Sequence, residues 1–331
     1  MVSLTILDVG HGNSAVLRDD DGTVVIDGGR RQTLLQFLKN CKITEIDVVL
    51  VSHADADHIG GIIEVLLDPS IHIRKLYVNP DPMRRKGTWD DFKSAVAKSL
   101  ASDNIDINTQ LTTRCSDELR RADVRIEVLS PSPVTALGGV GGQDLDGAKI
   151  IANSMSAVIR ISVGVKSRVL LASDIDARAL EDMVGRKVQL AAQVMVYPHH
   201  GGLAGQADIS KFVTRLCQLV EPSLVVFSVG RGEFENPRPK VVAAVLDALP
   251  NVHIACTQLS KACAADLPSF APDHVDGRTA RGAASNQCCA GTLEITLDES
   301  CLGWRPIADE HLAFVATVAP NALCRRVLMR E

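Results

Sequence analysis

Two successive runs of strand-like segments, each interleaved with helical segments, constrain the fold of this chain more than any other feature. The first run occupies residues 4–79 and the second residues 155–228. In both runs, short stretches rich in Val, Ile and Leu end at Gly and Asp turns, which is typical of strands. Strands that alternate with helices in two similar halves suit two packed sheets with helices outside. We therefore predict a mixed α/β (α+β) fold, built as a four-layer αββα sandwich.

The hydrophobic pattern also gives approximate bounds for the elements. In the first half we expect strands at residues 4–9, 14–18, 23–27, 47–52 and 76–79, and helices at 31–40, at 60–67 and from about 89. In the second half we expect strands at residues 155–163, 168–172, 194–197 and 224–228. Residues 131–148 are rich in Gly, Pro, Ser and Asp and are predicted to form a loop. The order is less regular after residue 257, with one more strand expected at 291–297.

Charge and aromatic content argue against a broad nucleic-acid groove. The chain has 35 Lys and Arg against 40 Asp and Glu, a net charge of -5, the opposite of a wide basic footprint. Aromatic residues make up only 3%, which leaves little material for base stacking. A local basic patch is still compatible with this composition. Its candidate is Arg84-Arg85-Lys86, which either holds a phosphate backbone or forms an ordinary solvated loop.

The sequence predicts a cytoplasmic protein without membrane contact. Its first residues are strand-like and lack the pattern of a signal peptide, and no apolar run is long enough to span a bilayer. Five of the nine cysteines are scattered singly, as reduced cytosolic thiols usually are. The other four, Cys256, Cys263, Cys288 and Cys289, lack paired Cys-x-x-Cys arms. Packed thiols are therefore favoured over a structural metal or a disulfide.

The densest group of potential metal ligands is the segment His53-Ala54-Asp55-Ala56-Asp57-His58. It directly follows an apolar strand at residues 48–51. Imidazole nitrogens and carboxylate oxygens hold divalent metals, and a loop at a strand end can direct them toward two ions. The alternative is a solvated acidic turn with incidental histidines. The density of ligands in six residues favours the metal site.

The spacing His53-x-Asp55-x-Asp57-His58-x-Gly60-Gly61 resembles the metallo-β-lactamase superfamily, and most of all its competence-type (ComEC-like) branch. Further segments follow in the order of that family, at residues 7–12, 25–29, 153–161, 170–174 and 198–202. The resemblance covers roughly residues 4–250. It implies the αββα sandwich, a site for one or two metals between the sheets, and hydrolysis by metal-bound hydroxide. We accordingly expect a hydrolase domain at residues 1–255, with residues 256–331 as a C-terminal extension packed on it.

The resemblance extends the predicted site beyond the motif. Asp174 is the candidate carboxylate that bridges two metals, with an ordinary turn or helix cap as the alternative. His199 and His200 end the next strand, and because adjacent side chains diverge, we expect only one of them to be a ligand. The other would contact substrate or donate a proton. Asp27 is expected to orient ligands or a water from behind, unless it only forms an Asp-Gly turn. Together with Asp57, His199 and Asp27 are the residues predicted to take part in catalysis.

Four further residues are candidates for substrate contact: His11, Asn153, Asn236 and Arg238. His11 lies between two glycines and either reaches the site or occupies a turn. Asn236 and Arg238 belong to a segment that resembles the family's Asn/His-Pro segment, although a Pro-rich helix start explains it equally.

Two departures from the family pattern bear on the metal and on the substrate. Asp55 stands where relatives that act on lactams or thioesters usually carry His, and Asn153 lies where they carry a further His. Oxygen ligands shift the preference from Zn²⁺ toward Mn²⁺ or Mg²⁺ and are common in phosphate-ester chemistry. We therefore expect two divalent ions (Mn²⁺ or Zn²⁺, with Mg²⁺ possible) and a phosphodiesterase or nuclease-type activity on a nucleotide or nucleic acid. The alternatives are an acyl hydrolase acting on thioesters or lactams, and a non-catalytic metal-binding module of a DNA-uptake or defence system.

Overall fold

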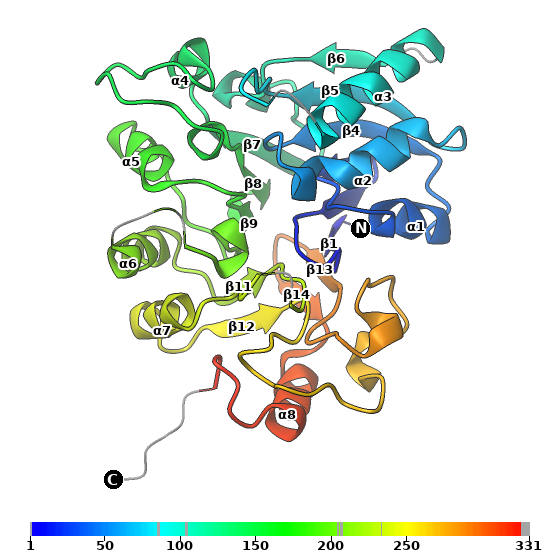
Figure 1. Cartoon of the computed structure of the whole chain (residues 1–331), viewed down its shortest axis with the longest axis vertical. Coiled ribbons are helices and arrows are strands. Elements are labelled where there is room, and N and C mark those ends of the chain that lie inside the picture. Colours follow the sequence, from blue (N-terminus) through cyan, green and yellow to red (C-terminus); the bar gives the residue numbers. More distant parts are fainter. Residues whose placement is uncertain are drawn as a thin grey trace.

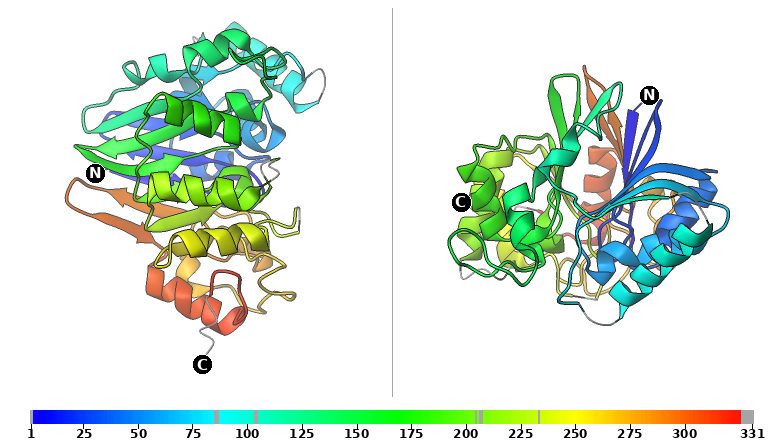
Figure 2. Two further views of the ribbon diagram at one scale, coloured as in Figure 1. Left: turned by 90° about the vertical axis from the view of Figure 1, so that its left-hand side faces the viewer. Right: turned by 90° about the horizontal axis from the view of Figure 1, so that it is seen from above.

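The computed structural model describes residues 2–84, 87–102, 105–203, 205, 208–232 and 234–325. Two sheets pack face to face in it, and helices cover both outer faces (Figures 1 and 2). This arrangement confirms the predicted four-layer αββα sandwich. In the part of the chain that is described, no helix is both long and apolar enough to cross a bilayer.

The first sheet contains eight strands, and its parallel half carries the ligand-rich motif. The strands are β1 (Val2–Ile6), β2 (Ala15–Asp19), β3 (Gly22–Ile26), β4 (Glu45–Val51), β5 (His72–Val78), β6 (Asp106–Asn108), β13 (Leu293–Leu297) and β14 (Leu302–Arg305). Their order is β14-β13-β1-β2-β3-β4-β5-β6, and the pairs from β3 to β6 are parallel. Helices α1 (Thr33–Asn40), α2 (Ala56–Leu67) and α3 (Thr88–Ser102) lie on its outer face (Figure 1).

The second sheet contains six strands and repeats this layout. The strands are β7 (Val124–Ser130), β8 (Val158–Val163), β9 (Lys166–Leu171), β10 (Val194–Val196), β11 (Leu224–Phe227) and β12 (His253–Cys256). Their order is β12-β11-β10-β9-β8-β7, and the pairs from β9 to β12 are parallel. Helices α5 (Ala177–Gly185), α6 (Ile209–Val220) and α7 (Pro239–Ala248) cover it outside.

Three hydrophobic clusters fill the spaces between the four layers. On β4, Val49 packs toward the helices with Ile62 of α2, while its neighbour Leu50 packs between the sheets with Val169 of β9. Consecutive strand residues point to opposite faces, so an apolar run such as that of β4 is buried on both sides. A third cluster joins the second sheet to its own helices. Each fully buried aliphatic side chain of this kind contributes about 1.5–3 kcal/mol.

The predicted loop at 131–148 contains a short helix, α4 (Pro133–Gly138). The Ser132 side chain accepts a hydrogen bond from the Thr135 backbone N–H, and Pro133 occupies the first helical position. Both are helix-start signals, which the Gly- and Pro-rich composition of the segment obscured. Strands β6, β7, β12 and β14 were also not predicted, because they are short or only partly apolar.

The C-terminal segment contacts both sheets. Strand β13 pairs antiparallel with β1, while Phe314 of helix α8 (Ala308–Val318) joins the core of the second sheet. The buried Asp8 carboxylate accepts hydrogen bonds from Gln258 Nε2 at 2.9 Å and from the Gly282 N–H at 2.8 Å. These contacts fix the loop that leads from β1 to His11. The boundary predicted at residue 255 stays a prediction.

All nine cysteines are free. Cys256, Cys288 and Cys289 are buried and Cys263 is partly buried. Among the described residues, no cysteine belongs to a group of three or more side chains close enough to hold a metal ion.

A buried histidine cluster lies in the C-terminal segment. His311 Nδ1 is 3.1 Å from His253 Nε2, and His311 Nε2 is 3.3 Å from Cys289 Sγ. The His274 ring packs edge-on against His311. Burial lowers the pKa of His311 to about 3, and it also lowers the pKa values of His253 and His274.

This cluster predicts a loss of stability in acid. An unfolded histidine titrates near pH 6.5, so below that pH the unfolded chain binds more protons than the folded one. The free energy of unfolding should therefore fall as the pH drops from about 6.5 toward about 3, by roughly 1.4 kcal/mol per pH unit from His311. Urea unfolding at about pH 7 and about pH 5 should show a smaller loss for His311→Gln than for the wild type. Equal losses would contradict the prediction.

Candidate metal centre

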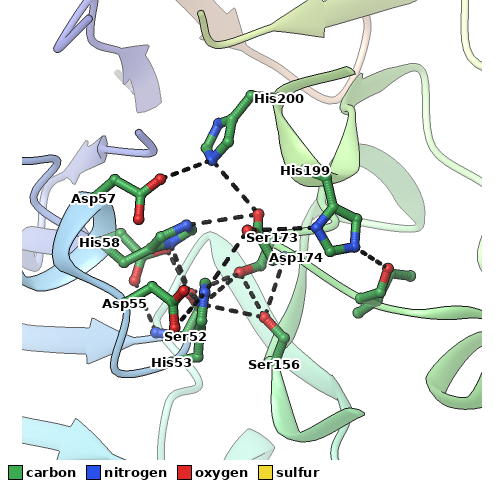
Figure 3. A network of polar contacts seen from close by, with 12 residues as sticks. Ser52, His53, Asp55, Asp57, His58, Ser156, Ser173, Asp174, His199 and His200 are labelled. Carbon is green, nitrogen blue, oxygen red and sulfur yellow. Dashed lines mark hydrogen bonds and ion pairs between the residues drawn. The ribbon is translucent and has the colours of Figure 1, made fainter. Parts of the chain in front are cut away.

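The carboxyl ends of parallel strands from both sheets surround one group of acidic and imidazole side chains (Figure 3). Asp27 follows β3 and the motif follows β4, while Asp174 follows β9 and the histidine pair follows β10. Parallel strands end at the same edge of a sheet, where ligand sites commonly form. The structure thus brings together seven of the predicted residues: His53, Asp55, Asp57, His58, Asp174, His199 and His200.

Unusual backbone conformations occur where these side chains enter the centre. The backbone φ angles of Asp27, Ser173, His199 and His200 are 56°, 50°, 51° and 54°. Such left-handed conformations cost about 1–3 kcal/mol in a non-glycine residue and cluster at functional sites. His199 and His200 are both left-handed, and both rings face Asp174. The expectation that only one of them is a ligand stays a prediction.

The two oxygens of the Asp174 carboxylate face different pairs of imidazoles. Oδ2 lies 3.8 Å from His53 Nε2 and 3.5 Å from His199 Nδ1. Oδ1 lies 3.6 Å from His58 Nε2 and also 3.6 Å from His200 Nε2. We call the atoms around Oδ2 the first ligand group and those around Oδ1 the second. One carboxylate therefore lies between two groups.

The two aspartates of the motif add one carboxylate to each group. Asp55 Oδ1 is 3.5 Å from His53 Nε2, in the first ligand group. Asp55 occupies the N-cap position of α2, yet its side chain makes no capping hydrogen bond, so the carboxylate is directed to the centre instead. Asp57 Oδ2 lies 3.4 Å from His200 Nε2 and 3.3 Å from His11 Nε2, in the second group.

Several atoms of the centre need a partner that the chain does not provide. Among the described residues, His53 Nε2, His58 Nε2, His200 Nε2 and Asp174 Oδ1 are buried without a hydrogen bond. Leaving such an atom unsatisfied costs about 1–3 kcal/mol. The distances of 3.3–3.8 Å between facing atoms also suit shared ions, because two ligand atoms about 2.1 Å from one tetrahedral ion lie about 3.4 Å apart. The donor set therefore fits divalent cations.

Hydrogen bonds behind two imidazoles fix the nitrogen that carries the proton. His58 Nδ1 lies 2.7 Å from Asp27 Oδ2, and His199 Nε2 donates to the Ile175 carbonyl at 2.9 Å. Each ring then presents its other nitrogen to Asp174, as metal-binding histidines do. Asp27 also accepts from the Ser52 N–H and hydroxyl, at 2.8 and 2.7 Å. It therefore supports His58 from behind and does not face the ligand groups.

Three serine hydroxyls surround the inner nitrogen of His53. Its Nδ1 lies 3.1 Å from Ser52 Oγ, 3.3 Å from Ser156 Oγ and 3.5 Å from Ser173 Oγ. Ser173 Oγ also donates to Ser52 Oγ at 2.7 Å. We did not predict Ser52 or Ser156. The available signals were the position of Ser52 between the strand and the motif, and that of Ser156 within the family-like segment at residues 153–161.

Burial and neighbouring carboxylates shift the pKa values of the histidines in the centre in opposite directions. Burial lowers the pKa values of His11 and His53 to about 3, so both are neutral near pH 7. Burial also opposes protonation of His58, but the Asp27 and Asp174 carboxylates outweigh it and raise the pKa well above the usual value. The pKa of His199 is raised against burial chiefly by the adjacent Asp174 carboxylate. A metal ion therefore competes with protons at these two rings.

Among the carboxylates, Asp174 is the most strongly held in its charged form. Burial opposes this, but His200 and the other imidazoles lower its pKa well below the usual value. The pKa of Asp57 is lowered in the same way, mainly by the adjacent His200 imidazole. Burial raises the pKa of Asp55, and Arg84 only partly offsets it. The centre thus presents anionic oxygens to a cation.

His11 is brought into the second ligand group. Its ring lies 4.3 Å from that of His200 and 4.2 Å from that of Phe234. The loop that carries His11 packs directly on the motif. A Cβ at Gly12, whose φ is +139°, would lie only 2.3 Å from the Asp57 carbonyl oxygen. Glycine at this position therefore permits the approach of His11.

The other predicted substrate contacts lie outside both ligand groups. Asn236 Nδ2 donates to the His199 carbonyl at 3.3 Å and so supports the turn that carries the histidine pair. Arg238 forms an ion pair with Glu235. Asn153 begins a 3₁₀ turn, and no hydrogen bond joins its side chain to the centre within the described residues.

A family model described as the metallo-beta-lactamase superfamily matches residues 7–223. No curated protein sequence matches the chain. Among solved structures, a metallo hydrolase from the archaeon Ignicoccus hospitalis is 17% identical, with 77% of this chain and 94% of that chain covered and a TM-score of 0.44. The metallo-beta-lactamase fold protein YhfI from Bacillus subtilis is 15% identical, with 77% and 97% covered and a TM-score of 0.45. A diphosphatase of the PhnP family is 14% identical, with 77% and 95% covered and a TM-score of 0.44.

Proposed function

The chain belongs to the metallo-β-lactamase superfamily and is a metal-dependent hydrolase, and we propose that it hydrolyses phosphodiesters with two divalent ions. The observation that carries this proposal is the Asp174 carboxylate, whose two oxygens face two separate pairs of imidazoles. Closely spaced pairs of divalent ions are typical of phosphatases and nucleases. Membership of the competence-type branch stays a prediction.

The proposed ligands follow the two groups around Asp174. The first ion would be held by His53, Asp55 and His199, the second by Asp57, His58 and His200, and both by Asp174. Bound there, the ions would polarise the phosphoryl group and lower the pKa of a water toward neutrality.

The chain's own groups position this chemistry. Asp27 keeps the proton of His58 on Nδ1, and the Ile175 carbonyl keeps that of His199 on Nε2. Asp57 lies between His200 and His11, which orients its carboxylate. Asp27, Asp57 and His199 therefore remain the residues that we propose for catalysis.

Each ligand group offers two carboxylates, with two imidazoles in the first when His199 is counted and three in the second when His11 is counted. Zn²⁺ and Mn²⁺ both accept such mixed sets, whereas Mg²⁺ prefers oxygen ligands and retained waters. We therefore propose Zn²⁺ or Mn²⁺ as the resident ions. The same imidazole content favours zinc-dependent hydrolysis of acyl substrates as the second candidate function.

The proposal is tested by stripping the purified protein with a chelator and reloading it with Mn²⁺, Zn²⁺ or Mg²⁺ separately. Hydrolysis of bis(p-nitrophenyl) phosphate should be lost on stripping and return with Mn²⁺ or Zn²⁺. A thioester and a β-lactam serve as parallel substrates. Turnover of those two alone would replace the proposal with acyl hydrolysis, and bound metal without any turnover would indicate a non-catalytic module.

A further inference from the structure

Arg84 reaches the metal centre from the loop that follows β5. Its Nη2 donates to Asp55 Oδ1, and its Nε donates to Asp81 Oδ2 at 3.1 Å. Asp81 is buried, and its other oxygen accepts from the Met83 N–H at 3.0 Å. The guanidinium is therefore held against the centre by the fold. Of the basic segment noted in the sequence, residues 85 and 86 lie outside the described residues.

Arg84 also borders the side of the centre that solvent reaches. The Asp55 side chain is 30% exposed, against 3% for His53 and 13% for Asp174. The Arg84 side chain, which contacts the same Asp55 oxygen as His53 does, is 36% exposed. A substrate that approaches the first ligand group from solvent therefore enters beside a fixed positive charge.

The guanidinium keeps donors available for such a substrate. It carries five N–H groups, and the contacts above use those on Nε and Nη2. Within the described part of the chain, Nη1 makes no hydrogen bond. A planar fork of donors matches two oxygens of a phosphate, and this geometry is specific to arginine.

We propose that Arg84 binds the non-bridging oxygens of the substrate's phosphoryl group, an inference that rests on the proposed phosphodiester hydrolysis. Asp55 and Asp81 hold the guanidinium at the opening, and its free edge meets the anion there. Arg238, the arginine predicted for substrate contact from the sequence, forms an exposed ion pair with Glu235. An uncharged acyl group would gain far less from a fixed cation, so Arg84 selects anionic esters.

The test compares Arg84→Gln and Arg84→Lys with the wild type, all in the metal-loaded protein. Arg74→Gln is the matched control, because Arg74 is likewise paired with two carboxylates but lies on the exposed part of β5. The readouts are kcat and KM for bis(p-nitrophenyl) phosphate, the inhibition constant of inorganic phosphate, and metal content. Arg84→Gln should raise KM and the phosphate inhibition constant about 10- to 100-fold, with two ions still bound. The lysine variant should fall between, and the control should not change.

Unchanged KM and phosphate inhibition in Arg84→Gln would overturn the inference. A second outcome would also overturn it: Arg84→Gln loses metal, but the fraction that stays loaded is inhibited by phosphate as the wild type is. Arg84 would then only support Asp55. If the wild type hydrolyses no phosphodiester, the proposed function fails on its own. Calorimetric binding of inorganic phosphate to the metal-loaded protein then decides the inference: weaker binding by Arg84→Gln supports an anion subsite, and equal binding overturns it.

Discussion

Replacement of Asp174 by Asn is expected to abolish binding of both ions and to lower hydrolysis by about three orders of magnitude or more. The physical reason is that Asp174 places one oxygen in each ligand group, where His53, His199, His58 and His200 lie 3.5–3.8 Å away. Asn keeps the size of the side chain but removes the negative charge that both groups share. Metal content after gel filtration, measured together with phosphodiesterase activity, checks the prediction.

Asp176 provides the matched control for this variant. It is also a buried aspartate just after β9, but it caps α5 through the Ala179 N–H at 2.9 Å and accepts from Ser154 Oγ at 2.6 Å. Asp176→Asn should therefore keep both ions and cost at most about 1 kcal/mol of unfolding free energy. Retention of two ions by Asp174→Asn would show that this carboxylate is not shared.

The layer order of the fold and the place of the centre could be predicted from local patterns. The apolar run of β4 leads directly into the motif, and that of β9 leads to Asp174. Parallel strands end at the same edge of a sheet, so residues that directly follow them lie close together. The strand patterns in the sequence were therefore sufficient to predict this group. Helix α4 was missed because the composition around it resembles a loop, although Ser132 and Pro133 form a helix start.

The orientation of the histidine pair could not be predicted, because it depends on contacts distant in sequence. The turn that carries His199 and His200 is held by Asn236 Nδ2, and its Gly201 carbonyl accepts from the Arg238 N–H at 2.8 Å. The rule that neighbouring side chains diverge assumes ordinary backbone angles. Two successive left-handed residues break that assumption.

The contact between Arg84 and Asp55 could not be predicted for the same reason. It depends on the turn that Asp81 organises in the loop after β5, and on how that turn packs beside the motif. The sequence left two interpretations of His11 open, a residue of the site or a residue of a turn, for a related reason. Its approach to Asp57 depends on how closely the Gly12 backbone packs against the motif.

Separate replacement of His199 and His200 by Ala is expected to remove different ions. His199 Nδ1 faces the Asp174 oxygen of the first ligand group, while His200 Nε2 faces that of the second and also Asp57. Each variant should therefore bind one ion instead of two and lose about two orders of magnitude or more of activity, because two-metal chemistry needs both positions. Metal content by elemental analysis and the absorption spectrum of the cobalt-substituted proteins should distinguish the two remaining sites.

His72→Ala is the control, since His72 begins β5, at the end of that strand away from the centre, and the variant should keep two ions. A His199→Ala protein that keeps two ions but loses turnover would make His199 a proton donor or substrate contact, as the family resemblance also allows. The first ligand group would then hold only one imidazole, that of His53, beside Asp55 and Asp174. Such an oxygen-rich site would shift the resident ion from zinc toward manganese, so the stoichiometry of this variant bears on both the ligand and the metal.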